Sequence, residues 1–130
     1  MSKKYQVIIK TRLEDRPKDH EMSAALILAN NYFKSDLVFL RPESYSSPDL
    51  DVNGVRWELK SPLGNGKKTI DNNMRAARKQ SDRVIVDFRR MKLHQTRALS
   101  RLNYYLKTGP HKFKAVTVIT KDRKMLEILK

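Results

Sequence analysis

The sequence of 130 residues contains no cysteine, which excludes disulfide bonds, thiolate zinc sites and a cysteine nucleophile. It has no apolar run long enough to span a membrane. The first ten residues, MSKKYQVIIK, lack the apolar core and cleavage site of a signal peptide. No repeat, low-complexity tract or Pro/Gly/Ser-rich linker divides the chain, so its length predicts one domain with its own core.

Acidic residues are also scarce, since 14 Asp and Glu stand against 28 Lys and Arg and the net charge is +14. The hydrophobic content of 39% and charged content of 32% are typical of a folded chain rather than a disordered one. A surface this basic attracts polyanions, and nucleic acid is the first candidate partner. An anionic membrane and an acidic protein are alternatives, but no Lys-rich amphipathic helix supports the membrane.

The apolar spacing predicts strands and helices that alternate along the chain. We expect an α/β fold, with a single domain built on a mixed β-sheet flanked by helices. The predicted strands cover residues 4–10, 36–40, 48–52, 55–60, 83–88 and 113–120. The predicted helices cover residues 19–33, 69–81 and 94–107, with a short closing helix within 122–130.

The segment PDLDVNGVRWELK predicts a β-hairpin that brings two acidic residues together. Asn53-Gly54 between two alternating runs is the signal of a two-residue type I′ turn. Counting outward from this turn, Asp49 lies opposite Glu58. Because side chains alternate along a strand, both share one face of the hairpin with Lys60.

Like charges placed opposite each other destabilise a hairpin unless something positive lies between them. The single ammonium of Lys60 is too little for four carboxylate oxygens. A divalent cation, Mg²⁺ or Mn²⁺, would satisfy Asp49 and Glu58 together with water and a phosphate oxygen. Lys60 would then orient or deprotonate the attacking water, or stabilise charge on the scissile phosphate. The alternative is that these charges only form the solvent-exposed face of a hairpin.

Two neighbours in the hairpin receive structural roles. Asp51 faces Arg56, so an ordinary cross-strand ion pair explains it. Trp57 lies on the apolar face, so we expect it in the core rather than stacked on a base.

Basic residues just before, along and after the predicted helix at 69–81 are candidates for contacts with a phosphate backbone. The alternative is a solvated helix face. The candidates are Lys67, Lys68, Arg75, Arg78, Lys79, Arg89 and Arg90. His20, His94 and His111 are scattered and lack metal-ligand spacing, which leaves a metal-independent ribonuclease as a weak alternative.

Pro48-Asp49, followed after eight residues by Glu58-Leu59-Lys60, resembles the signature of the PD-(D/E)XK nuclease superfamily. The predicted order of elements also resembles the αβββαβ core of that superfamily, with an extra C-terminal helix and strand. The resemblance implies a nuclease core over 19–92. Residues 1–18 would then form an N-terminal strand and loop, and 93–130 a helix, strand and helix that complete the sheet.

The same resemblance implies roles for individual residues. Asp49 and Glu58 would be metal ligands and Lys60 would be catalytic. Glu21, at the start of the first long helix, would be a further acid, although a carboxylate is also favourable near any helix N-terminus. Gln80 would be an accessory polar residue of the site, with an ordinary surface glutamine as the alternative.

A longer stretch, from about Glu21 to Lys92, is similar to the C-terminal tRNA-nuclease domain of CdiA-type contact-dependent growth inhibition toxins. The similarity lies in WELKSP-GN-K-TI and KQSD-VIVD. It implies metal-dependent cutting of tRNA in the cytoplasm, delivery within a larger toxin and a cognate immunity protein. The chain carries Met1 and no delivery region, so an excised toxin domain and a freestanding relative both fit. A DNA endonuclease of the same superfamily and a non-catalytic nucleic-acid-binding module remain the alternative functions.

Overall fold

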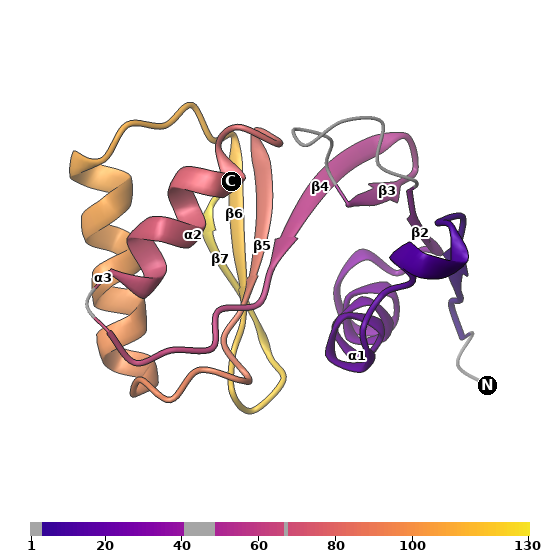
Figure 1. Cartoon of the computed structure of the whole chain (residues 1–130), viewed down its shortest axis with the longest axis horizontal. Helices are drawn as coiled ribbons and strands as arrows, with labels where there is room; N and C mark the ends of the chain where they lie inside the picture. Colours follow the sequence, from indigo (N-terminus) through magenta and orange to yellow (C-terminus); the bar gives the residue numbers. More distant parts are fainter. Residues whose placement is uncertain (1–3, 41–48, 67) are drawn as a thin grey trace.

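The computed structural model describes residues 4–40, 49–66 and 68–130, which form one mixed sheet with helices on both faces (Figure 1). The strands lie in the sheet in chain order. They are β1 (Val7–Ile9), β2 (Leu37–Phe39), β3 (Leu50–Val52), β4 (Val55–Lys60), β5 (Arg83–Asp87), β6 (Ala115–Ile119) and β7 (Met125–Leu129). The β1–β2, β4–β5 and β5–β6 pairs are parallel, and the other pairs are antiparallel.

The helices divide between the two faces of the sheet (Figure 1). Helix α1 (Asp19–Leu28) continues as the π-helical turn η2 (Ala29–Phe33) and covers one face, while α2 (Thr69–Ala77) and α3 (Gln95–Thr108) cover the other. A short 3₁₀ turn, η1 (Leu13–Asp15), precedes α1. Strand β5 is apolar on both faces because Ile85 packs toward α1 and Val84 and Val86 pack toward α2 and α3.

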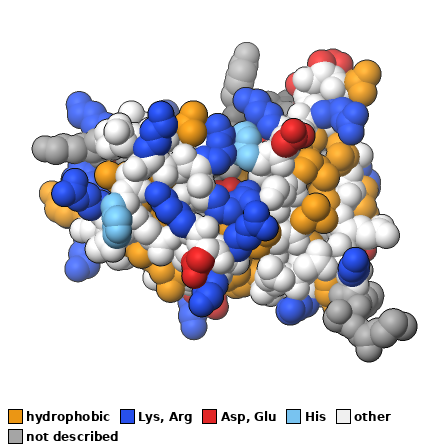
Figure 2. Space-filling model, turned by 90° about the horizontal axis from the view of Figure 1, so that it is seen from below, with side chains coloured by type: hydrophobic (Ala, Val, Ile, Leu, Met, Phe, Trp, Pro, Cys, Tyr) orange, Lys and Arg blue, Asp and Glu red, His pale blue; other side chains and the backbone are white. Residues whose placement is uncertain are grey.

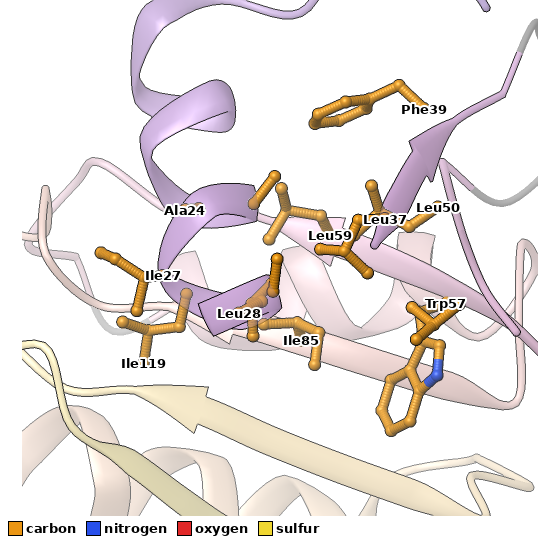
Figure 3. Close-up of a cluster of buried hydrophobic side chains, with 13 residues drawn as sticks. Ala24, Ile27, Leu28, Leu37, Phe39, Leu50, Trp57, Leu59, Ile85 and Ile119 are labelled. Carbon is orange, nitrogen blue, oxygen red and sulfur yellow. The ribbon is translucent and has the colours of Figure 1, made fainter. Parts of the chain in front are cut away.

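The core under α1 ties the N-terminal and C-terminal strands together (Figure 3). Leu28 of α1 is fully buried with Leu59 of β4 and Ile85 of β5, and Ile119 of β6 belongs to the same cluster. The Trp57 ring packs edge-on against Phe33 at 5.2 Å between ring centroids. The prediction that Trp57 is a core residue is therefore confirmed.

The predicted hairpin is confirmed in both turn and register. Asn53 and Gly54 have φ angles of 52° and 83°, the left-handed conformation that a type I′ turn requires at both positions. The backbone pairs Val52 with Val55 and Asp51 with Arg56. Strand β4 continues as far as Lys60, so the register carries through to the proposed catalytic residues.

The predicted closing helix within 122–130 is wrong, because this segment forms the strand β7. It pairs antiparallel with β6 through a turn in which the Arg123 amide donates to the Thr120 carbonyl. A short apolar run such as MLEIL fits a strand and a helix equally well. The unpaired edge of β6 decides between them, because its backbone groups need partners.

None of the helices in the described ranges has the length and apolar content that a membrane span needs.

Shortening a core side chain of α1 tests this packing. Leu28 is fully buried and Leu26, on the same helix, is 46% exposed. Leu28→Ala is expected to lower the free energy of unfolding by ~2–5 kcal/mol because it leaves a cavity. The matched variant Leu26→Ala should lower it by less than about 1 kcal/mol. Urea denaturation followed by circular dichroism measures both, and equal losses would contradict the assigned core.

Candidate active site

The two acidic residues of the hairpin lie directly before β3 and within β4. The Leu59 amide donates a hydrogen bond to Asp49 Oδ2 at 3.4 Å, which turns the Asp49 side chain toward β4. Glu58 precedes Leu59, and its side chain is only 1% exposed. Asp49 and Glu58, called the carboxylate pair below, thus lie beside each other in a largely buried place, as the hairpin register predicted.

Lys60 satisfies only part of this pair. Its Nζ lies 2.9 Å from Glu58 Oε2, and its side chain is 20% exposed. The second oxygen, Glu58 Oε1, is buried and has no hydrogen-bond partner in the described part of the chain. A buried acceptor without a donor is costly, so this oxygen needs either a proton or a cation.

Burial is the main cause that shifts the titration of both carboxylates. Burial, followed by the negative charge of Asp49, raises the pKa of Glu58 to about 8, and Lys60 opposes the shift. Burial likewise raises the pKa of Asp49, while hydrogen bonding with the Glu58 carboxyl and with the Leu59 amide favours its ionised form. Without a cation, the carboxylate pair therefore retains a proton near neutral pH.

The donor set of the site fits a hard divalent cation. Carboxylate oxygens are the ligands that Mg²⁺ and Mn²⁺ prefer, and Glu58 Oε1 has a free lone pair within the pair. Across the described residues, no group of three or more His, Cys, Asp or Glu side chains could hold a metal. A cation bound here would therefore take its remaining ligands from water or from a phosphate.

Glu21 reaches the same region from α1. It lies in the first turn of that helix, where its Oε1 accepts a hydrogen bond from the Lys18 amide at 2.8 Å. Glu21, Asp49 and Asp15 also line one small cavity of ≈ 70 Å³. The structure thus brings Glu21 next to Asp49 and shows a helix-capping role for its carboxylate. Asp15 lies in a polar, proline-containing stretch whose pattern gives no signal of a site.

Asp51 and Gln80 lie farther along the hairpin and after α2. Asp51 Oδ1 accepts a hydrogen bond from the Gly54 amide at 2.9 Å. The expected Asp51–Arg56 ion pair is wrong in the described ranges: the residues are paired in register, but the carboxylate accepts the hydrogen bond of the turn instead.

Gln80 is partly buried in the turn after α2, where its backbone amide donates to the Ala77 carbonyl. Its role in the site remains a prediction.

The predicted phosphate-binding residues fall into two groups. The first group is exposed at the start of α2 and along it, and consists of Lys68, Arg75, Arg78 and Lys79. Lys67, like Pro48 of the sequence signature, lies outside the described residues. Figure 2 shows Lys and Arg side chains spread over one face of the molecule with few acidic side chains between them.

Arg89, in the second group, is engaged inside the protein. Its guanidinium pairs with the fully buried Asp87 at 2.9 Å, and it donates to Ser23 Oγ at 2.8 Å and to the His20 carbonyl at 3.0 Å. These contacts hold the first turns of α1, which include Glu21, against the end of β5. Arg90 Nη1 lies 2.6 Å from His20 Nε2. We therefore treat Arg89 as a residue that positions α1 rather than as a phosphate ligand.

Comparison with known proteins identifies the family. The sequence profile of the contact-dependent growth inhibition CdiA C-terminal domain matches residues 46–125. The chain belongs to this family. The matched segment of this CdiA C-terminal domain contains Asp49, Glu58 and Lys60. Among curated proteins, no sequence is significantly similar to the chain.

A solved structure shares the fold of this CdiA C-terminal domain. It is a CdiA-CT/CdiI toxin and immunity complex from Burkholderia pseudomallei, with a TM-score of 0.67. The match covers 96% of this chain and 99% of that chain at 18% sequence identity. At this identity the match shows that the two chains share a fold, with a mixed sheet between helices.

Two variants test the ion pair between Arg89 and Asp87. Arg89→Met should lower the free energy of unfolding by ~3–5 kcal/mol, because it leaves the buried Asp87 carboxylate unpaired. The double variant Arg89→Met, Asp87→Leu should recover a large part of this loss, since no unpaired charge remains. Urea denaturation measures both variants. Equal losses in the single and double variants would contradict a buried ion pair.

The raised pKa of Glu58 predicts how stability depends on pH in metal-free protein. A carboxyl whose pKa rises on folding binds its proton more tightly in the folded chain, so stability falls as pH increases from 4.5, its ordinary value, toward about 8. Glu58→Gln mimics the protonated form, so it should exceed the wild type in stability by ~1–3 kcal/mol at pH 8. The difference should vanish near pH 5. Denaturation in EDTA at both pH values measures it, and a variant equally or less stable at pH 8 would contradict the assigned shift.

Proposed function

We propose that this CdiA C-terminal domain is a metal-dependent endonuclease that hydrolyses phosphodiester bonds, with tRNA as its substrate. The observation that carries the proposal is the carboxylate pair: Glu58 is buried beside the partly buried Asp49, its Oε1 has no hydrogen-bond partner among the described residues, and Lys60 lies 2.9 Å from its Oε2. A buried acid beside a partly buried one, both with raised pKa values, is typical of a functional site rather than of a solvated hairpin face.

Asp49 and Glu58 would hold Mg²⁺ or Mn²⁺ through their carboxylate oxygens. Such an ion, when bound, supplies charge to polarise a phosphate oxygen and lowers the pKa of a coordinated water. Lys60 is partly exposed, and its ammonium is kept in place by Glu58 Oε2. From there it would orient the attacking water and stabilise negative charge on the phosphate. Glu21 borders the same cavity as Asp49 and would be an accessory acid.

The order of elements supports a PD-(D/E)XK core. Helix α1 is followed by β2, β3 and β4, then by α2 and β5, which is the αβββαβ order that the sequence resemblance implied. Glu58 and Lys60 lie on β4 and Asp49 directly precedes β3, which is consistent with the order of the signature. Strand β6, helix α3 and strand β7 extend this core toward the C-terminus.

The choice of tRNA rests on the resemblance described above, and DNA is the second candidate. The CdiA-CT structure that shares this fold was determined as a toxin and immunity complex. We therefore propose that a cognate immunity protein exists for this domain too. The domain would be delivered as part of a larger toxin and would act in the cytoplasm of the cell that receives it.

Removing one group of the site at a time tests the proposal. Glu58→Gln and Lys60→Ala should each reduce cleavage of total tRNA by at least about 100-fold, because the first removes a charged ligand of the ion and the second removes a positive charge beside the phosphate. Binding of tRNA should change little, since phosphate contacts elsewhere provide most of the affinity. EDTA should stop cleavage by the wild type. Gel electrophoresis of tRNA and duplex DNA, with Mg²⁺, Mn²⁺ or EDTA, measures these effects.

Asp51→Asn is the matched control, because Asp51 is a carboxylate on the same hairpin that closes the turn and lies outside the pair. This variant should retain cleavage. Cleavage that persists in EDTA would overturn the metal proposal. Intact nucleic acid under every condition would instead favour a basic module that only binds it.

A further inference from the structure

An open groove of ≈ 400 Å³ lies between the end of α2 and the loop that follows α3. It is lined by Arg78, Pro110, His111 and Lys112. The site described above uses none of the three loop residues. Arg78 is the C-terminal capping residue of α2, so the groove begins where the exposed basic face of that helix ends.

The loop wall of this groove is held in one conformation. The Gly109 amide donates to the Tyr105 carbonyl at 2.6 Å, and the Tyr105 hydroxyl donates to the Pro110 carbonyl at 2.9 Å. His111 Nε2 donates to the Leu106 carbonyl at 2.7 Å. A Cβ on residue 109 would lie 2.7 Å from the Tyr105 ring, so this close approach requires glycine. The groove is thus preorganised and would lose little entropy on binding a ligand.

His111 forms part of the wall rather than a reactive group. Its Nδ1 accepts a hydrogen bond from the Phe113 amide at 3.2 Å, so both ring nitrogens are used inside the loop. Its ring stacks on Phe113 with 5.3 Å between centroids. This arrangement fixes the chain on both sides of the exposed Lys112, which lines the groove.

The groove carries two cations without a counter-ion. Arg78 and Lys112 are exposed, and neither forms a salt bridge in the described part of the chain. By contrast, Arg83 and Lys114 both pair with Asp82 nearby in the sequence. Two unpaired cations on a rigid groove favour an anionic ligand that reaches both.

We propose that this groove binds a backbone phosphate of the nucleic-acid substrate, as a subsite separate from the carboxylate pair. The choice of ligand rests on the proposed function. Arg75 and Arg78 form a basic line along α2, and α2 follows β4 and Lys60 in the chain. Evenly spaced phosphates match such a line better than the scattered carboxylates of a protein do.

Binding measured without cleavage tests the subsite. Wild type and variants are titrated in EDTA against fluorescently labelled tRNA, and anisotropy is recorded at several salt concentrations. Lys112→Ala and Arg78→Ala should each weaken binding by roughly 3–10-fold and lower the slope of log K against log salt by about one. Lys112→Arg should retain wild-type affinity. Lys4→Ala, an exposed lysine before β1 at the far edge of the sheet, is the matched control and should change neither quantity.

The outcomes separate this subsite from the carboxylate site. Unchanged affinity and salt slope in Lys112→Ala and Arg78→Ala would overturn the subsite, even if the wild type cleaves tRNA. Weaker binding in both variants would support it, even if EDTA-resistant cleavage refuted the metal proposal. Normal tRNA binding combined with weaker binding of a purified acidic immunity protein would overturn it and assign the groove to that partner.

Discussion

The repulsion between Asp49 and Glu58 is the constraint on which the rest of the site depends. Glu58 is 1% exposed, and one of its oxygens has no partner among the described residues. A fold that only needed stability would place apolar side chains or a matched ion pair here. Here two acids instead lie side by side, and Lys60 forms an ion pair at 2.9 Å with one of them, Glu58. This arrangement would become favourable if the proposed divalent cation replaced the proton that the pair retains.

The scaffold around the pair keeps this unfavourable contact in place. The type I′ turn at Asn53-Gly54 fixes the register of β3 and β4, and the Leu59 amide holds Asp49 toward β4. On the opposite face of β4, Leu59 packs into the core under α1 (Figure 3). The ion pair of Arg89 with Asp87 fastens α1, and with it Glu21, to the end of β5. Packing energy from the core thus offsets the cost of burying the acids.

The features set by local chemistry could be predicted from the sequence. The Asn-Gly turn leaves few alternatives for the register, so the meeting of Asp49 and Glu58 followed directly. The segment at 125–129 was misassigned because its short apolar run fits a helix or a strand, and only pairing with β6 decides. The ion pair of Arg89 with Asp87 was not predicted, because an arginine after a strand is also typical of a basic surface. The signal that could have indicated it is Asp87, an acid at the end of an apolar strand, where a buried carboxylate needs a cation.

The measurement that tests the central claim most directly is a crystal structure of the wild-type domain with Mn²⁺, with anomalous scattering to locate the ion. We expect one strong anomalous peak within ligand distance of a carboxylate oxygen of Asp49 and of Glu58, at about 2.1 Å as for the oxygen ligands of Mg²⁺. We also expect that Glu58 Oε1 becomes a ligand. A fully occupied ion elsewhere, or an Mn²⁺-saturated crystal with no peak at the carboxylate pair, would contradict this expectation.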